Sequence, residues 1–139
     1  MKKYIGLSAL FAVTLVMPSF ANDPVEMRQE RFKALGDDIK QVFRKHLPAN
    51  DFAAIESFAK GAEGWAKEIP TAFPEGATSK DAKPEIWENW SDFEAKAQAF
   101  EAASAKLALA AQSQDAGATG AAAKALGATC KACHNDYRN

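Results

Sequence analysis

Residues 84–114 read PEIWENWSDFEAKAQAFEAASAKLALAAQSQ, and the spacing of their apolar side chains decides the fold class. Apolar or small residues recur at alternating steps of four and three residues, which places them on one face of an α-helix. They are Ile86, Trp90, Phe93, Ala97, Phe100, Ser104, Leu107 and Ala111. Pro84 suits the first turn of a helix, where a backbone N–H would have no partner. We therefore predict a helix from Pro84 to about Gln114.

Residues 24–47 carry a similar stripe. Its members follow steps of seven, three or four residues: Val25, Phe32, Leu35, Ile39, Val42 and His46. Asp23 can cap the start, Pro24 fits the first turn, and Pro48 stops the pattern. The stretch predicts a helix that ends near Leu47.

Residues 51–69 form a third predicted helix, with Asn50 as a plausible cap and Pro70 as its end. The stripe consists of Phe52, Ile55, Ala59, Ala62, Ala66 and Ile69, with Phe58 and Trp65 beside it. Residues 71–83 contain both proline and glycine, so we expect a loop there.

The last helix is predicted over residues 121–137, after a turn at residues 115–120 that contains two glycines. After residue 22 the chain has few β-branched residues and much Ala, Lys, Glu and Gln, which favours helix over strand. Short links make neighbouring helices antiparallel. The predicted fold class is therefore all-α, an antiparallel up-down-up-down four-helix bundle.

The N-terminal residues 1–21 are typical of a secretory signal peptide that is cleaved after Ala21. Lys2 and Lys3 precede an apolar run over residues 5–17, and small residues occupy positions 19 and 21. The alternative is a membrane anchor, but the run is too short to span a bilayer. We therefore expect export to the periplasm and one domain over residues 22–139.

Charge excludes some partners. The chain has 17 basic and 18 acidic residues and no basic patch, so nothing indicates nucleic-acid binding. After the signal peptide, no segment is long and apolar enough for a membrane span.

The chemistry lies in the run Cys130-Lys131-Ala132-Cys133-His134, which has the C-x-x-C-H pattern of haem c attachment. On a helix, residues three and four apart share one face, so both sulfurs and the imidazole point the same way. Cys130 and Cys133 could then form thioethers with the haem vinyl groups while His134 ligates the iron. The run predicts one covalent haem c per chain.

The two cysteines allow three other interpretations. A thioredoxin-type redox site belongs beside a parallel sheet, and this chain predicts no strands. A zinc site needs about four ligands, and only the distant His46 could add to those of the motif. A disulfide between Cys130 and Cys133 would close too short a loop to stabilise much.

The sixth iron position has few candidates. After the signal peptide the chain has one methionine, Met27, and one histidine besides His134, which is His46. Met27 lies about 200° around the helix from Val25, so it should miss the core stripe. His46 lies on the stripe but at the far end of its helix. We therefore expect a five-coordinate iron with an apolar distal face.

With these features the sequence resembles the cytochrome c-prime family, whose haem site lies near the C-terminus. The resemblance covers the whole chain after the signal peptide. It is carried by Arg28-Gln29 with Phe32, by residues 81–87 (DAKPEIW) and by residues 130–138 (CKACHNDYR).

The resemblance implies a homodimer and a high-spin haem that binds nitric oxide and carbon monoxide. Separately, we expect one-electron exchange with a redox partner that the sequence does not identify. The resemblance implies that Arg28 and Gln29 lie by the haem propionates. Helical spacing agrees for Arg28, which is one turn before Phe32 and should lie at the edge of the apolar stripe, where a guanidinium could bind a carboxylate bidentately. The resemblance also implies a proximal role for Arg138 and places Asp81 in a loop that borders the haem edge. Phe32 is a departure, because relatives usually have an aliphatic residue at this distal position.

Three functions follow as hypotheses: a gas-binding haem protein, a respiratory electron carrier without a gas-binding role, and a peroxidase. A peroxidase would need a distal acid-base group such as His or Glu. An apolar distal face does not supply one, so we predict that the protein is not an enzyme.

Overall fold

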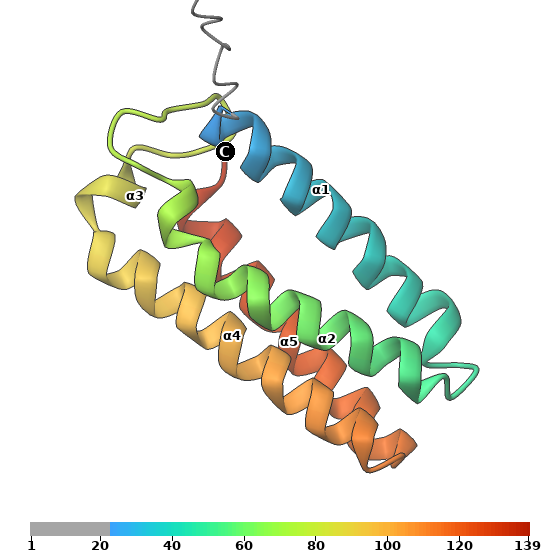
Figure 1. Ribbon diagram of the computed structural model, residues 1–139. Helices are drawn as coiled ribbons and strands as arrows, with labels where there is room; N and C mark the ends of the chain where they lie inside the picture. The colour runs from blue at the N-terminus through green and yellow to red at the C-terminus, as the bar shows by residue number, and fades with distance from the viewer. Residues whose placement is uncertain (1–22) are drawn as a thin grey trace, which may run out of the picture.

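The computed structural model describes residues 23–139, and this part of the chain contains helices and no strands. The helices are α1 (Pro24–Gln41), α2 (Phe52–Glu68), α3 (Glu85–Glu88), α4 (Trp90–Gln112) and α5 (Ala116–Tyr137) (Figure 1). A π-helical turn, Val42–His46, extends α1, and a 3₁₀ turn, Pro70–Ala72, follows α2. The predicted antiparallel four-helix bundle is confirmed, with α3 as an added turn. Within residues 23–139, no helix has both the length and the apolar character needed to cross a membrane.

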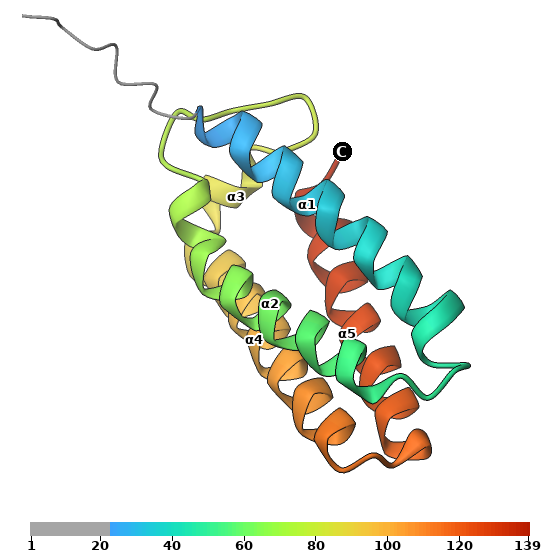
Figure 2. The same cartoon turned by 45° about the vertical axis from the view of Figure 1, so that its right-hand side comes forward.

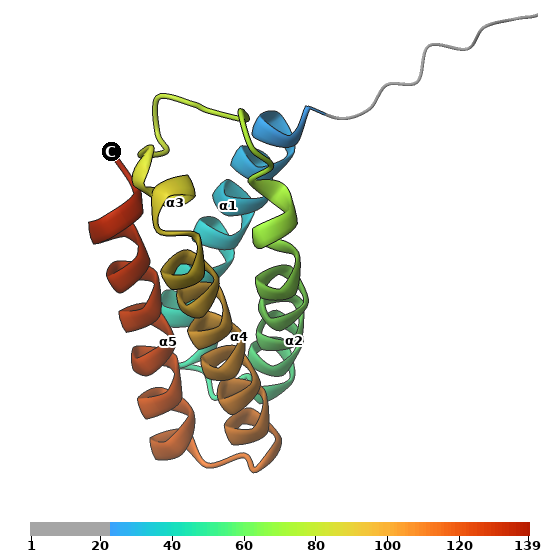
Figure 3. The same ribbon diagram turned by 90° about the vertical axis from the view of Figure 1, so that its left-hand side faces the viewer.

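The long loop and the C-terminus lie at one end of the bundle. The start of α1, the loop between α2 and α3, α3 itself and the end of α5 gather there, while the α1–α2 and α4–α5 links lie at the other end (Figures 1 and 2). α4 packs along both α2 and α5, whereas α1 makes few contacts with α2. Figure 3 shows the four long helices side by side, with α3 above α4.

Aspartates set the starts of three helices. The side chain of Asp23 accepts a hydrogen bond from the Val25 N–H at 2.9 Å, as predicted. α2 is capped by Asp51, which accepts from the Ala54 N–H at 3.2 Å. The prediction of Asn50 as this cap was wrong, because Asn50 takes a left-handed backbone conformation with φ of 51°.

α5 begins five residues earlier than predicted, at Ala116 rather than residue 121. Asp115 accepts a hydrogen bond from the Ala118 N–H at 2.8 Å and so satisfies one of the free donors of the first turn. The two glycines in this turn cost helix stability of only about 1 kcal/mol each. A good cap followed by alanines therefore outweighs them.

The predicted helix over residues 84–114 is interrupted at Asn89, which leaves the helical region with φ of −118° and ψ of 45°. Its side-chain amide donates to the Glu85 carbonyl at 3.4 Å, a local bond of the kind by which asparagine competes with helix. The break lets the Trp87 indole N–H reach the carbonyls of Phe73 at 3.1 Å and Pro74 at 3.3 Å. α3 is thereby attached to the loop.

The core is built mainly by α2, α4 and α5. Fully buried side chains include Ile55 on α2, Leu107 on α4 and Leu126 on α5. In contrast, the apolar stripe of α1 is only half-buried against this core; it comprises Phe32, Leu35 and Ile39. Met27 also packs against the core, so the expectation that it would miss the core was wrong. α1 thus presents an apolar face that the protein alone does not fully cover.

Candidate haem site

The C-x-x-C-H run lies in the last two turns of α5, close to the C-terminus. α5 is one continuous helix through these turns, so Cys130, Cys133 and His134 have the predicted three- and four-residue helical spacing. Both cysteines are free thiols, half-buried against the core, and the His134 side chain is exposed. Among residues 23–139 there is no group of three or more His, Cys, Asp or Glu side chains arranged as a metal-ion site.

The surroundings of the two thiols raise their pKa values. Burial raises the pKa of Cys130, and it raises the pKa of Cys133 to about 11 against the opposing charge of Lys96. A dithiol redox site depends on a thiolate with a lowered pKa. These thiols have the opposite property, which argues against the thioredoxin-type interpretation.

His134 is shifted toward its neutral form. Partial desolvation, and then the positive charge of Arg138, lower the pKa of the imidazole. Neutral imidazole is the form that ligates metals. The chemistry of this donor set, two thiols and a neutral imidazole on one helix face, fits covalent haem c with a proximal histidine.

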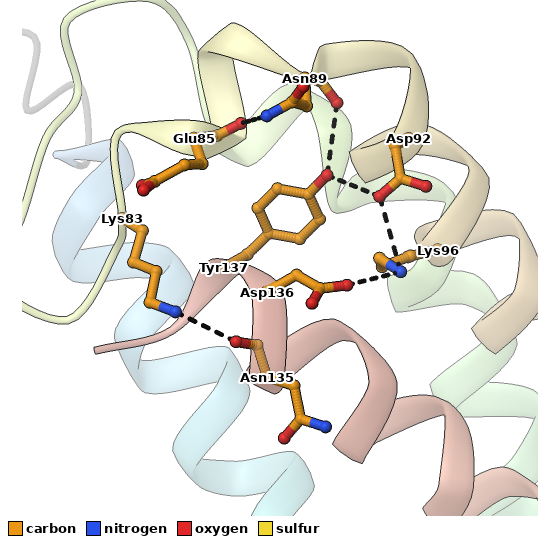
Figure 4. A network of polar contacts seen from close by, with 8 residues as sticks. All are labelled: Lys83, Glu85, Asn89, Asp92, Lys96, Asn135, Asp136 and Tyr137. Atoms are coloured by element: carbon orange, nitrogen blue, oxygen red, sulfur yellow. Dashed lines mark hydrogen bonds and ion pairs between the residues drawn. The ribbon is translucent and has the colours of Figure 1, made fainter.

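A polar network fixes the end of α5 against α4 (Figure 4). The buried Tyr137 donates its hydroxyl proton to Asp92 at 2.6 Å, and burial together with this bond raises the pKa of Tyr137 to about 12. Lys96 bridges the two helices through ion pairs with Asp92 at 3.5 Å and Asp136 at 2.9 Å. Charge-assisted hydrogen bonds of this kind are among the strong ones. The helix end that carries His134 therefore has a defined position.

The loop before α3 adds a second attachment, in which the carbonyls at the end of α5 accept hydrogen bonds from Lys83. The Lys83 N–H donates to the Tyr137 carbonyl at 3.0 Å, and its side chain donates to the Asn135 carbonyl at 3.0 Å. Ala82 and Arg138 form an antiparallel bridge. Two of the predicted site residues, Asp81 and Arg138, are thus on neighbouring backbone segments, and both side chains are exposed.

Arg28 is buried, with only 2% of its surface exposed, rather than at the edge of the stripe as expected. Its guanidinium donates to the carbonyls of Ala72 at 3.0 Å and Ala77 at 2.6 Å, and it lies 4.2 Å from the centre of the Phe73 ring. Burial lowers the pKa of Arg28, and the charge of Asp23 opposes this. Arg28 therefore fastens the loop to α1.

Gln29 lies next to Arg28 on the exposed side of α1. Its side-chain amide donates to the Asp81 carboxylate at 3.4 Å. The structure thus brings together Arg28, Gln29 and Asp81 at the end of the bundle where α5 ends. A role for them at a haem carboxylate stays a prediction.

Phe32 belongs to an aromatic cluster that extends from α2 to the end of α5. Its ring lies 5.3 Å from Trp65, in an edge-to-face arrangement, and 6.3 Å from Phe73. Phe73 contacts Phe93 at 4.9 Å, and Phe93 contacts Tyr137 at 5.4 Å. Phe32 on α1 is thereby connected to the residue three positions after His134.

Sequence reasoning did not single out Trp65 or Phe73 as site residues. Trp65 was placed beside the core stripe, and Phe73 lay in the segment expected to be a loop. An aromatic residue at helical spacing is usually core, so periodicity gave no signal for a role near the site.

His46 is far from His134. The turn Val42–His46 lies at the end of the bundle opposite the C-terminus (Figure 2). The His46 ring nitrogen Nδ1 pairs with the Asp51 carboxylate at 2.9 Å, which gives the side chain a local partner at the α1–α2 link.

Comparison with known proteins gives one consistent result. The family model described as cytochrome C' matches residues 23–138. The chain is 32% identical to cytochrome c' of Rhodospirillum rubrum, with 99% of each chain covered. It is 33% identical to cytochrome c-556 of Agrobacterium fabrum, covering 98% of this chain and 94% of the relative.

Solved structures of cytochrome c prime from Alcaligenes xylosoxidans are also similar. The nitric oxide complex of one variant has a TM-score of 0.74 at 30% identity, covering 84% of this chain and 94% of that one. A carbon monoxide-bound variant has a TM-score of 0.76 at 31% identity, with the same coverage.

Proposed function

Since this chain belongs to the cytochrome c' family, we propose that it is an exported cytochrome that binds nitric oxide and carbon monoxide and exchanges single electrons. Its cofactor is a covalently bound haem c, for which the two cysteines of the family are present. When bound, the haem supplies an iron that accepts a diatomic ligand or an electron. In this proposal Cys130 and Cys133 hold the haem, and His134 is the axial ligand.

One observation carries the proposal: the last turns of α5 present two half-buried thiols and an exposed imidazole at helical spacing. The apolar stripe of α1 is also only half-buried. A flat apolar cofactor attached to α5 would cover such surfaces and gain the free energy of their burial. The network around Tyr137 supports this role, because it positions the helix that carries the axial ligand.

We further propose that the iron is five-coordinate. His46 lies at the other end of the bundle and is paired with Asp51. Met27 packs against the core on α1, one residue before the buried Arg28. Phe32, the member of the aromatic cluster that α1 contributes, is proposed to lie over the distal face.

The surrounding polar residues are proposed to serve the haem edge. Gln29 and Asp81 face each other at the loop, and Arg138 lies on the segment bridged to that loop. Arg28 uses two nitrogens to hold the loop carbonyls. A guanidinium has five N–H donors, so others remain for a haem carboxylate.

A gas-binding protein is favoured over an enzyme. The two aromatic side chains that Phe32 packs against, Trp65 and Phe73, carry no acid-base group of the kind that peroxide cleavage requires. A dedicated electron carrier is the second candidate, and an iron without a sixth protein ligand, as proposed above, would be less suited to it. We also propose a homodimer in the periplasm, on the resemblance to the family.

Covalent attachment is tested first. We expect the haem colour to stay with the protein after extraction with acidified acetone. The double variant Cys130→Ala/Cys133→Ala should lose the colour under the same treatment, whereas Lys131→Ala, between them, should keep it. Colour that leaves the unmutated protein with the solvent would rule out the assignment of both cysteines.

Export and assembly are tested on the same purified protein. The intact mass should correspond to a chain that begins at Asn22 and carries one haem. Sedimentation velocity at micromolar concentration should give a dimer. A single species of monomer mass would refute the dimer without affecting the haem assignment.

A further inference from the structure

Trp65 has a hydrogen-bond donor that no protein atom uses. The residue is 95% buried, and among residues 23–139 its indole Nε1 is the one fully buried side-chain nitrogen or oxygen without a hydrogen-bond partner. An indole N–H can only donate. Native proteins pair the large majority of such buried groups, so an unpaired one requires an explanation.

The side chain is held firmly in this position. The Phe32 ring packs edge-to-face against the indole at 5.3 Å, and the Arg31 guanidinium lies 5.5 Å from the ring centre. Trp87 provides a contrast within the same molecule, because its N–H donates to two loop carbonyls. The missing partner at Trp65 is therefore a property of that site and not of tryptophan in this fold.

The partner has to come from outside the polypeptide, and the position of Trp65 limits what it can be. Trp65 directly contacts Phe32, the residue proposed to lie over the distal haem face. Through Phe73 and Phe93 the same cluster reaches Tyr137, at the helix end that carries His134. The unpaired donor thus belongs to the side chains that surround the proposed haem.

We propose that Trp65 is the hydrogen-bond donor of the distal haem pocket, and that its N–H binds an oxygen atom of the haem or of a ligand bound to it. This oxygen belongs either to a haem carboxylate or to the outer end of a diatomic gas bound in the site. The inference rests on the proposed function. It replaces the purely apolar distal face expected from the sequence with a pocket that has one fixed donor.

The competing partner is water. Trp65 also lines a cavity of about 430 Å³ between α1 and α2, whose walls include Leu35, Phe58 and Ala62. A water molecule there would pair the indole without any link to the haem. The experiment must therefore detect the hydrogen bond through the vibrations of its acceptor, the haem carboxylate or the bound gas.

The test compares the ferrous carbon monoxide complexes of the unmutated holoprotein, Trp65→Phe and Trp87→Phe by resonance Raman spectroscopy. Both variants lose the same atoms from a tryptophan that contacts the aromatic cluster, but only Trp65 has the unpaired donor. If the N–H binds the gas, Trp65→Phe raises the C–O stretching frequency and lowers the Fe–C frequency. If it binds a carboxylate, the propionate bending band shifts instead. Trp87→Phe should move neither.

Identical gas and propionate bands in Trp65→Phe and the unmutated protein would overturn the proposal and leave water as the partner. The visible absorption change on adding carbon monoxide reports gas binding separately. A failure of the proposed function, in which no gas binds, is therefore distinguishable from a failure of this inference.

A second measurement covers the case in which Trp65→Phe does not fold. The chain has three tryptophans, so the holoprotein of Trp87→Phe/Trp90→Phe contains Trp65 alone. Ultraviolet resonance Raman then reports the hydrogen-bonding state of this one indole. A band that moves when carbon monoxide is added supports the gas as acceptor. A band at the non-bonded position both with and without gas would overturn the proposal.

Discussion

Replacing Phe32 with alanine should open the distal haem face and raise the affinity for carbon monoxide. In the structure, the ring is held by two aromatic contacts, with Trp65 at 5.3 Å and with Phe73 at 6.3 Å. Each such pair contributes about 1 kcal/mol beyond its buried area, so moving the ring away from both costs about 2 kcal/mol. At about 1.4 kcal/mol per factor of ten, a ligand that must displace the ring loses roughly 30-fold in affinity.

The assay is a carbon monoxide titration of the ferrous protein followed by absorbance. Phe32→Ala should bind at least tenfold more tightly than the unmutated protein by this estimate. Phe43→Ala is the matched control, because Phe43 is an exposed phenylalanine in the turn at the other end of the bundle. Equal affinities for Phe32→Ala and the unmutated protein would show that Phe32 does not gate the distal face.

Two further predictions concern the helix end and the iron. Tyr137→Phe removes the donor that most lowers the pKa of Asp92, so it should lower the Tm by roughly 5 °C near neutral pH. Because the folded-state pKa of Asp92 is depressed, this contribution is present above the ordinary pKa of 3.8 and is lost as the pH falls through the folded value. Urea unfolding at about pH 7 and about pH 3 measures the free energy of unfolding of Tyr137→Phe and of the unmutated protein. The two free energies should differ less at about pH 3 than at about pH 7. An equal difference at both pH values would contradict the role of Asp92. Met27→Leu and His46→Gln should leave the absorption spectra of the ferric and ferrous protein unchanged, and a change in either would identify a sixth ligand.

The stripe spacing predicted the fold because it reports burial directly. Ile86, Phe93, Phe100 and Leu107 are all buried, as the alternation of four and three requires. The break at Asn89 could not be read from the same pattern, since the stripe continues across it. The break is linked to the hydrogen bonds between the Trp87 indole and two loop carbonyls. These carbonyls belong to residues 13 and 14 positions earlier in the chain.

The candidate site also combines features that the local sequence predicts with features that depend on distant residues. The motif from Cys130 to His134 is local, and its helical spacing is enough to predict the shared face. The burial of Arg28 is not local, because its partners Ala72 and Ala77 lie 44 and 49 residues away. Arginine is almost never fully buried unless paired, so sequence reasoning favoured the edge of the stripe. The unpaired N–H of Trp65 is likewise visible only when every neighbouring acceptor has been placed.

The two sides of the proposed haem site differ in how firmly the protein holds them. On the α5 side, Tyr137, Lys96 and the bridge from Ala82 to Arg138 fix the helix end through charged and backbone hydrogen bonds. On the α1 side, the half-buried Phe32 is held mainly by ring contacts, which are weaker and less directional. An axial histidine on the first side would keep its geometry while an incoming ligand displaced the ring on the second. Ligand discrimination in this arrangement would then depend on the cost of moving Phe32 and on the donor that its movement exposes at Trp65.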